Sequence, residues 1–103
     1  MATDKPRKPS QTERLLAAYA AAGETGLTDE EAAAASGLLK LTLCCWWKRC
    51  GELRKAGRIE PAAAVGDIPV TRRGTTGHPR RVCRITVDGL RDYQRLVRSG
   101  VLR

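Results

Sequence analysis

The side chains of this sequence that are best suited to binding a ligand are arginines and lysines, and they gather in two stretches. Residues 40–60 carry six positive and two negative charges, and residues 70–86 carry five arginines and no acid. Residues 23–31, in contrast, carry four acids and no base. A surface that faces an anion shows this separation of signs, and the commonest large anion is a nucleic-acid backbone. With a net charge of +8, the sequence predicts a nucleic-acid-binding surface, although a charged surface that serves solubility alone remains the simpler alternative.

Residues that could do other chemistry do not form a recognisable site. The four cysteines and one histidine, at Cys44, Cys45, Cys50, Cys83 and His78, lack the paired Cys-x2-4-Cys spacing of tetrahedral zinc sites. The sequence also lacks a pair of carboxylates in an apolar setting and a glycine-rich phosphate loop. We therefore expect no enzymatic activity, no metal and no cofactor.

The length and the apolar pattern indicate a single folded domain. The chain has 103 residues, and two domains of half that length would each lack a sufficient core. No stretch approaches the roughly 18 apolar residues that a membrane span needs, and no apolar run resembles a signal peptide. We expect a disordered basic arm at residues 1–9, a domain at residues 10–103, a cytoplasmic location and reduced thiols.

Two capping boxes mark the first two helices. Ser10-Gln-Thr-Glu13 and Thr28-Asp-Glu-Glu31 both have the spacing in which a hydroxyl caps the third amide and the glutamate reaches back. The first box predicts a helix that ends at Gly23. The second predicts a short, alanine-rich helix that ends at residues 36–37.

A third, basic helix is predicted over residues 42–56, with Thr42 as its N-cap. Leu43, Trp46, Cys50 and Leu53 follow the 3-4-3 spacing of a buried helical stripe. A short helix, a turn and a basic helix form a helix-turn-helix, whose second helix can lie in the major groove of DNA. The candidate DNA-binding side chains on this recognition helix are Lys48, Arg49, Arg54, Lys55 and Trp47.

These candidates have different expected roles. Lys48 and Arg54 are the first candidates for reading bases, because a lysine or bidentate arginine on guanine is the commonest direct contact. Arg49 could equally bind phosphate. Trp46 is expected in the core. Trp47 has three interpretations: it packs under residues 60–67, it is exposed for a partner protein, or it stacks on DNA.

A hairpin and a last helix are predicted to complete the domain. Ile68–Arg73 and Arg81–Thr86 read as strands around residues 74–79, with alternate residues of the second strand facing in and out. Asp88 is the expected N-cap of the last helix. The apolar side chains expected to face inward from that helix are Leu90, Tyr93 and either Leu96 or Val97.

The predicted fold is therefore mainly α with a small β-hairpin, in the order helix, helix, helix, hairpin, helix. This order is that of a winged helix-turn-helix, in which the hairpin at residues 68–86 is the wing. A positively charged wing can contact phosphates or the minor groove. Its candidate DNA-binding residues are Arg72, Arg73, Arg80, Arg81 and Arg84.

Several segments resemble small winged-helix proteins of bacteriophages and bacterial regulators. Leu53-Arg-Lys-Ala-Gly57-Arg-Ile59, Thr71-Arg-Arg-Gly74 and Arg81-Val-Cys-Arg-Ile-Thr86 are similar to the end of their recognition helix and to their wing, and Gly26-Leu-Thr-Asp-Glu-Glu31 to their second helix. The resemblance implies binding of double-stranded DNA in the control of transcription, lysogeny or recombination in a bacterial host cell. Cys44-Cys45-Trp46-Trp47 departs from the small polar and basic residues usual in that family.

Other functions remain open at this point. The chief alternative is a winged helix that binds a host or self protein through the Trp47 face or the last helix, because a fold does not fix a function. An architectural protein that bends DNA would use the same residues. A homodimer through the last helix would cover two half-sites, but the same apolar residues could instead close the core of a monomer.

Overall fold

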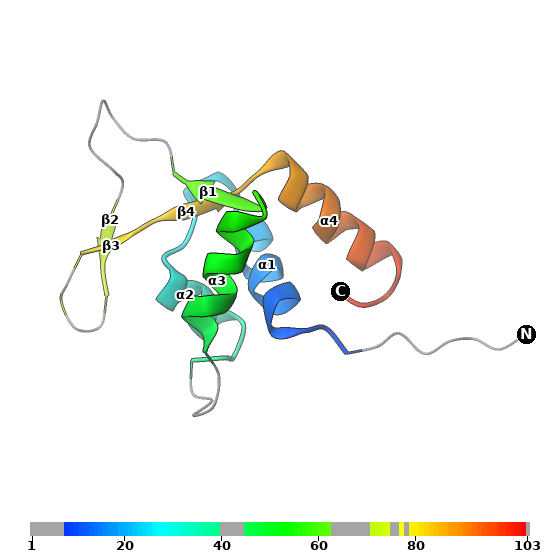
Figure 1. Cartoon of the computed structure of the whole chain (residues 1–103), viewed down its shortest axis with the longest axis horizontal. Coiled ribbons are helices and arrows are strands. Elements are labelled where there is room, and N and C mark those ends of the chain that lie inside the picture. Colours follow the sequence, from blue (N-terminus) through cyan, green and yellow to red (C-terminus); the bar gives the residue numbers. More distant parts are fainter. Residues whose placement is uncertain (1–7, 40–44, 63–70, 75–76, 78, 103) are drawn as a thin grey trace, which may run out of the picture.

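The computed structural model describes residues 8–39, 45–62, 71–74, 77 and 79–102. This part of the chain has a mixed α+β architecture, with four α-helices and two small antiparallel sheets (Figure 1). None of its helices has the length and apolar character needed to cross a membrane. In chain order the elements are α1 (Gln11–Ala22), η1 (Gly23–Thr25), α2 (Asp29–Ala35), α3 (Trp46–Lys55), β1 (Ile59–Pro61), β2 (Thr71–Arg73), β3 (Pro79–Arg81), β4 (Cys83–Ile85) and α4 (Val87–Arg98).

Both predicted capping boxes are confirmed. At α1 the Glu13 amide donates to Ser10 Oγ at 3.2 Å, and the Ser10 amide donates to the Glu13 carboxylate at 2.8 Å. Thr28 and Glu31 make the same reciprocal pair at α2. Such pairs satisfy amides that the helix itself leaves without partners, so both helices begin where the sequence predicts.

Helix α3 begins later than predicted. Its first residue is Trp46, and Cys45 before it has a non-helical backbone and provides no side-chain cap. The predicted cap Thr42 and the predicted inward residue Leu43 lie outside the described residues. The start at residue 42 is therefore wrong, because apolar spacing reports which residues pack together and not where the helix begins. As a result, α2 and α3 are joined by residues 36–45, a longer connection than the typical helix-turn-helix turn of about 3–4 residues.

The β structure also differs from the predicted hairpin. The alternation predicts one strand over Arg81–Thr86, but the chain leaves one sheet at Arg81 and joins another at Cys83. β3 pairs with β2, whereas β4 pairs with β1, which was not predicted as a strand. Val82 and Cys83 are both buried, so the expected alternation is wrong because the change of sheet interrupts the two-residue period. Residues 68–70 lie outside the described residues.

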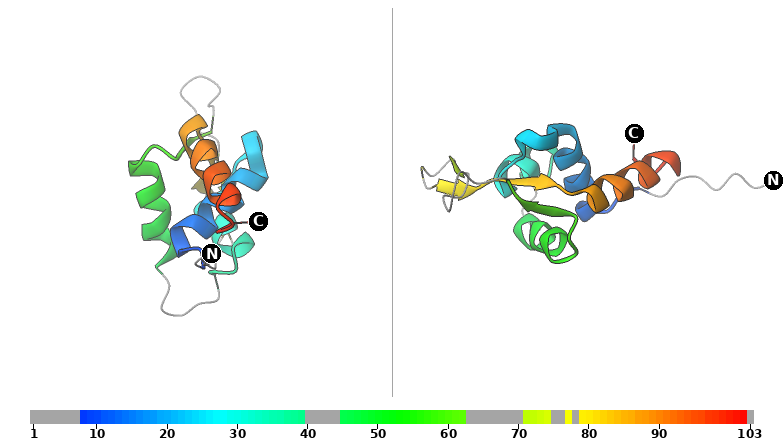
Figure 2. Two further views of the ribbon diagram at one scale, coloured as in Figure 1. Left: turned by 90° about the vertical axis from the view of Figure 1, so that its right-hand side faces the viewer. Right: turned by 90° about the horizontal axis from the view of Figure 1, so that it is seen from above.

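The core is built around α1, which contacts α2, α3, α4 and β4 (Figures 1 and 2). Tyr19 and Leu15 of α1 are fully buried, as is Cys50 of α3. Trp46 is only partly buried and packs against this core. At one end of the molecule the β2–β3 hairpin projects away from the helices, and α4 lies at the other end (Figure 2).

Helix α4 is capped by Thr86 and not by Asp88. Thr86 is extended and its hydroxyl accepts a hydrogen bond from the Gly89 amide at 3.0 Å, which places Asp88 inside the first turn. Tyr93 packs against the core as predicted, and so does Leu96 rather than Val97. Leu90 and Val97 are 39% and 37% exposed. The expectation that Leu90 faces inward is therefore wrong.

Candidate nucleic-acid interface

The outward side of α3 exposes an aromatic ring and two lysines. Trp47 is 52% exposed and makes a T-shaped contact with the Trp46 ring, with 5.5 Å between ring centroids. Of its three interpretations, this exposure weighs against packing beneath residues 60–67, of which residues 63–67 lie outside the described residues. Lys48 and Lys55 are exposed, and no ion pair between described residues includes either one.

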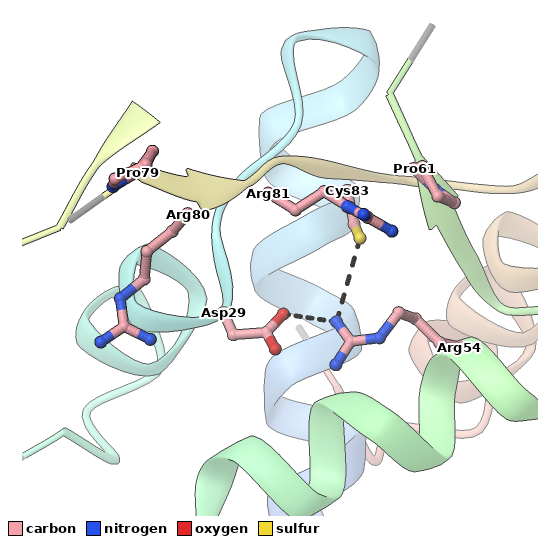
Figure 3. Close-up of a pocket in the computed structure, with 7 residues that line it drawn as sticks. All are labelled: Asp29, Arg54, Pro61, Pro79, Arg80, Arg81 and Cys83. Carbon is pink, nitrogen blue, oxygen red and sulfur yellow. Dashed lines mark hydrogen bonds and ion pairs between the residues drawn. The ribbon is translucent and has the colours of Figure 1, made fainter. Parts of the chain in front are cut away.

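Arg54 lies on α3 but is engaged with α2. Its Nη1 donates to Asp29 Oδ1 at 2.7 Å (Figure 3). The same oxygen accepts a hydrogen bond from the Tyr19 hydroxyl at 2.9 Å. Arg54 Nη1 also lies 3.9 Å from Cys83 Sγ. The hydrogen bond to Asp29 raises the pKa of the Arg54 guanidinium above its ordinary value. Arg54 therefore connects α3 to α2. Base reading by Arg54 stays a prediction, and the ion pair with Asp29 weighs against it.

Two arginines of the β2–β3 hairpin are held by the same end of α2. Arg72 Nη1 lies 3.3 Å from Glu31 Oε2, and Arg72 Nη2 donates to the Gly26 carbonyl at 2.8 Å. Arg80 Nε lies 3.7 Å from Glu30 Oε2. Together with Arg54 and Asp29, each acid in the first turn of α2 thus pairs with an arginine from α3 or the hairpin. These pairs connect the hairpin and α3 to the start of α2.

The remaining candidates are distributed over other surfaces. Arg84 pairs with Glu60 at 3.3 Å across the β1–β4 sheet, and Arg49 pairs with Glu52 at 3.2 Å along α3. Arg81 is exposed on β3, and no ion pair between described residues includes it. The side chain of Arg73 lies outside the described residues.

A hollow of about 530 Å³ separates α3 from the β2–β3 hairpin. Figure 3 shows Arg54 and Arg81 on the side of Cys83, whereas Arg80 extends toward α2. Asp29 lies between these arginines. The described residues that line the hollow are Asp29, Arg54, Pro61, Pro79, Arg80, Arg81 and Cys83. The structure therefore brings together one candidate from α3 and two from the hairpin.

Sequence reasoning missed the role of the three acids in the first turn of α2. In the sequence, Asp29, Glu30 and Glu31 indicate a helix start and an acidic stretch, whereas in the structure they pair with three of the candidate arginines. The charge pattern could have predicted these ion pairs, because residues 23–31 are acidic and the two basic stretches that follow can supply the arginines. Opposite charges that fold against each other lower the number of cations available to a ligand.

The buried thiols are poorly suited to chemistry. Burial raises the pKa of Cys50 to about 12, and burial also raises the pKa of Cys83 above its ordinary value. Because the thiolate is the nucleophile and the metal ligand, both groups are unreactive near neutral pH. The described residues contain no cluster of three or more potential metal ligands.

Comparison with known proteins gives no assignment: no family model, no curated protein and no solved structure matches the chain.

Proposed function

We propose that this chain is a winged-helix protein that binds double-stranded DNA, with α3 in the major groove and the β2–β3 hairpin as a wing on the backbone or in the minor groove. The observation that carries the proposal is the convergence of Arg54 from α3 and Arg80 and Arg81 from the hairpin on one hollow. An α-helix fits the major groove of B-DNA, and positively charged side chains beside it bind the flanking phosphates.

The exposed cations of α3 support the same orientation. Lys48 and Lys55 lie near opposite ends of this helix and are exposed. Neither has a counter-ion among the described residues, so each can neutralise a phosphate without first breaking an ion pair. Lys48 keeps its proposed role at the bases, while Arg54 is better placed to bind the backbone.

The ion pairs at the start of α2 connect the hairpin to the helical part of the domain. Surface ion pairs stabilise a fold only weakly, by about 0–1 kcal/mol each, so their main effect is on geometry. Arg72 is held by Glu31 and by two backbone carbonyls, which makes it an anchor of the wing more than a contact to DNA. We therefore assign direct DNA contacts to Lys48, Lys55 and Arg81, together with a backbone contact from Arg54.

The test is a salt titration with a random-sequence duplex. For a protein that neutralises Z phosphates, the logarithm of the binding constant falls with the logarithm of the salt concentration with a slope of about −0.9Z. The wild-type protein should show a steep slope, and Lys55→Ala should reduce its magnitude by about one. Arg98→Ala, which removes one charge from exposed α4 at the far end from the wing, is the matched control and should leave the slope unchanged. Absent or salt-insensitive binding by the wild-type protein would overturn the proposal.

A second function is favoured by the exposure of Trp47. A tryptophan that is 52% exposed is typical of protein interfaces, where tryptophan is enriched among the residues that dominate affinity. In that case the protein would bind a partner protein even at high salt, and Trp47→Ala would abolish this binding. Duplex DNA would not compete with the partner protein. If instead duplex DNA displaces the partner, the two functions use the same side of α3.

A further inference from the structure

We propose that the hollow between α3 and the β2–β3 hairpin binds one phosphate group, and that in the DNA complex this is a phosphodiester of the strand that passes between the two grooves. The inference rests on the proposed function and adds the ligand group, its location and the residues that hold it. Arg54 and Arg81 bind the phosphate, Arg80 borders the entrance, and Asp29 orients Arg54.

The charge of the hollow favours an anion. Three arginines are among the described residues that line it, together with the carboxylate of Asp29. Arg54 pairs with Asp29 and Arg80 with Glu30, so Arg81 is the lining arginine that no ion pair between described residues includes. The described contacts of Arg54 use one of its terminal nitrogens, whereas a guanidinium has five N–H donors. A phosphate presents several acceptor oxygens, and arginine binds this group with two parallel hydrogen bonds.

The ion pair with Asp29 holds Arg54 beside the hollow and leaves other N–H donors of its guanidinium for a ligand. Asp29 is itself fixed by the Tyr19 hydroxyl at 2.9 Å, and Tyr19 is fully buried in the core. This series of contacts connects the guanidinium of Arg54 to the buried core of the domain. Arg54 therefore meets an incoming phosphate in a set orientation, which lowers the conformational entropy lost on binding.

The shape of the hollow suits a phosphate that belongs to a continuous strand. Its volume of about 530 Å³ is far larger than one phosphate group needs, and it is open to solvent. α3 and the hairpin lie on opposite sides of it. Since a backbone strand separates the major groove from the minor groove, a duplex that places α3 in the first and the hairpin at the second directs that strand across the hollow.

The experiment compares Arg81→Ala with Arg98→Ala in the full-length protein. Each variant removes one exposed arginine for which no ion pair between described residues is found, but only Arg81 lines the hollow. With a random duplex, loss of one phosphate contact should reduce the magnitude of the salt slope by about 0.9, which corresponds to about eightfold weaker binding at 0.1 M salt. Arg98→Ala should bind as tightly as the wild-type protein.

Asp29→Asn provides a second variant with the opposite sign. The amide oxygen can still accept hydrogen bonds from Tyr19 and Arg54, while the negative charge beside the phosphate is removed. One charge at roughly 6 Å in a near-aqueous medium corresponds to about threefold tighter binding. Thermal melts of each variant establish that it is folded before its affinity is interpreted. Equal affinity and equal slope for Arg81→Ala and Arg98→Ala, or no gain for Asp29→Asn, would overturn the phosphate site.

Titration with inorganic phosphate, followed by the amide NMR signals of residues 29, 54, 81 and 83, separates the two possible sources of the ligand. Duplex binding with no distinct effect of Arg81→Ala refutes the hollow but leaves DNA binding intact. A different outcome is that inorganic phosphate shifts these signals, that Arg81→Ala abolishes the shifts, and that duplex DNA shows no salt-dependent binding. This outcome would support a phosphate site but would refute both its assignment to DNA and the proposed function.

Discussion

Gly89 in the first turn of α4 is predicted to tolerate no side chain. A Cβ atom built on Gly89 would lie well inside 3.0 Å of the Arg58 carbonyl oxygen and 2.9 Å from Ile85 Cγ1. The backbone of Arg58 cannot easily withdraw, because its carbonyl also accepts the Thr86 amide at 3.0 Å. Gly89→Ala must therefore displace α4 from the β1–β4 sheet or distort the turn after α3.

The expected cost is set by two opposing effects. Alanine has a higher helix propensity than glycine by up to about 1 kcal/mol, which favours the variant. Forcing a methyl group into a packed site typically costs about 1–3 kcal/mol and occasionally more, and here the obstructing atoms belong to the backbone. We expect a net destabilisation of about 2 kcal/mol, which lowers the melting temperature of a domain of this size by about 10 °C.

Gly51→Ala in α3 is the matched control. Apart from the neighbouring backbone of α3 itself, no atom of the described residues lies within 4 Å of a Cβ atom built on Gly51, so the helix-propensity term acts alone. This variant should be about 0.5–1 kcal/mol more stable than the wild-type protein. The same substitution in two helices is thus expected to change stability in opposite directions.

Urea and thermal denaturation followed by circular dichroism measure both effects. The transition midpoint should move down for Gly89→Ala and up for Gly51→Ala relative to the wild-type protein. A Gly89→Ala protein as stable as the wild type would show that α4 does not approach Arg58 as closely as described. A loss at both positions would instead point to a general effect of alanine and refute the packing argument.

Two further predictions concern the cap of α4 and the buried thiols. Thr86→Ala removes the hydroxyl that accepts a hydrogen bond from the Gly89 amide at 3.0 Å and donates one to the Gly57 carbonyl at 2.6 Å. Urea denaturation should show that the free energy of unfolding falls by about 1–2 kcal/mol, and Thr86→Ser should retain most of the wild-type stability. Equal losses for the two variants would exclude the hydroxyl as the cause. Burial, aided by the charge of Asp29, raises the pKa of Cys50 from about 9 to about 12, so the folded thiol stays protonated in a range where the unfolded thiol ionises. The free energy of unfolding should therefore fall between about pH 9 and pH 12, by at most about 4 kcal/mol from this group; Cys50→Ala should flatten the decline, and an unchanged pH dependence would contradict the assignment.

The parts of the fold that could be predicted are those fixed by local chemistry. Ser10 and Thr28 each satisfy orphan amides within their own first turn, so the capping boxes located α1 and α2 without any knowledge of tertiary contacts. Gly57 ends α3 at a φ of 74°, a conformation that few other residues adopt. Apolar spacing within α3 also identified Cys50 and Leu53 as buried.

The parts that could not be predicted depend on partners distant in the sequence. β1 is a three-residue strand that exists through its pairing with β4, and nothing in Ile59-Glu-Pro61 indicates that partner. The division between β3 and β4 at Val82 likewise reflects two different pairing partners. Short strands of this kind have little intrinsic preference, since strand formation depends mainly on cross-strand neighbours.

The number of cations that the candidate site offers to a ligand also depends on partners distant in the sequence. Composition counts charges, whereas binding depends on how many of them the fold leaves for a ligand. Five of the candidate arginines, at positions 49, 54, 72, 80 and 84, have an acidic partner within 4.0 Å.

A phosphate that approaches one of these arginines must share or displace a carboxylate, so such a residue releases less free energy on binding than an unpaired lysine. The count of 19 lysines and arginines therefore overstates the number of phosphates that the protein can neutralise. If DNA binding is confirmed, the salt slope should correspond to the few cations that lack a counter-ion, and neutralising an acid at the start of α2 should strengthen binding more than adding a lysine elsewhere.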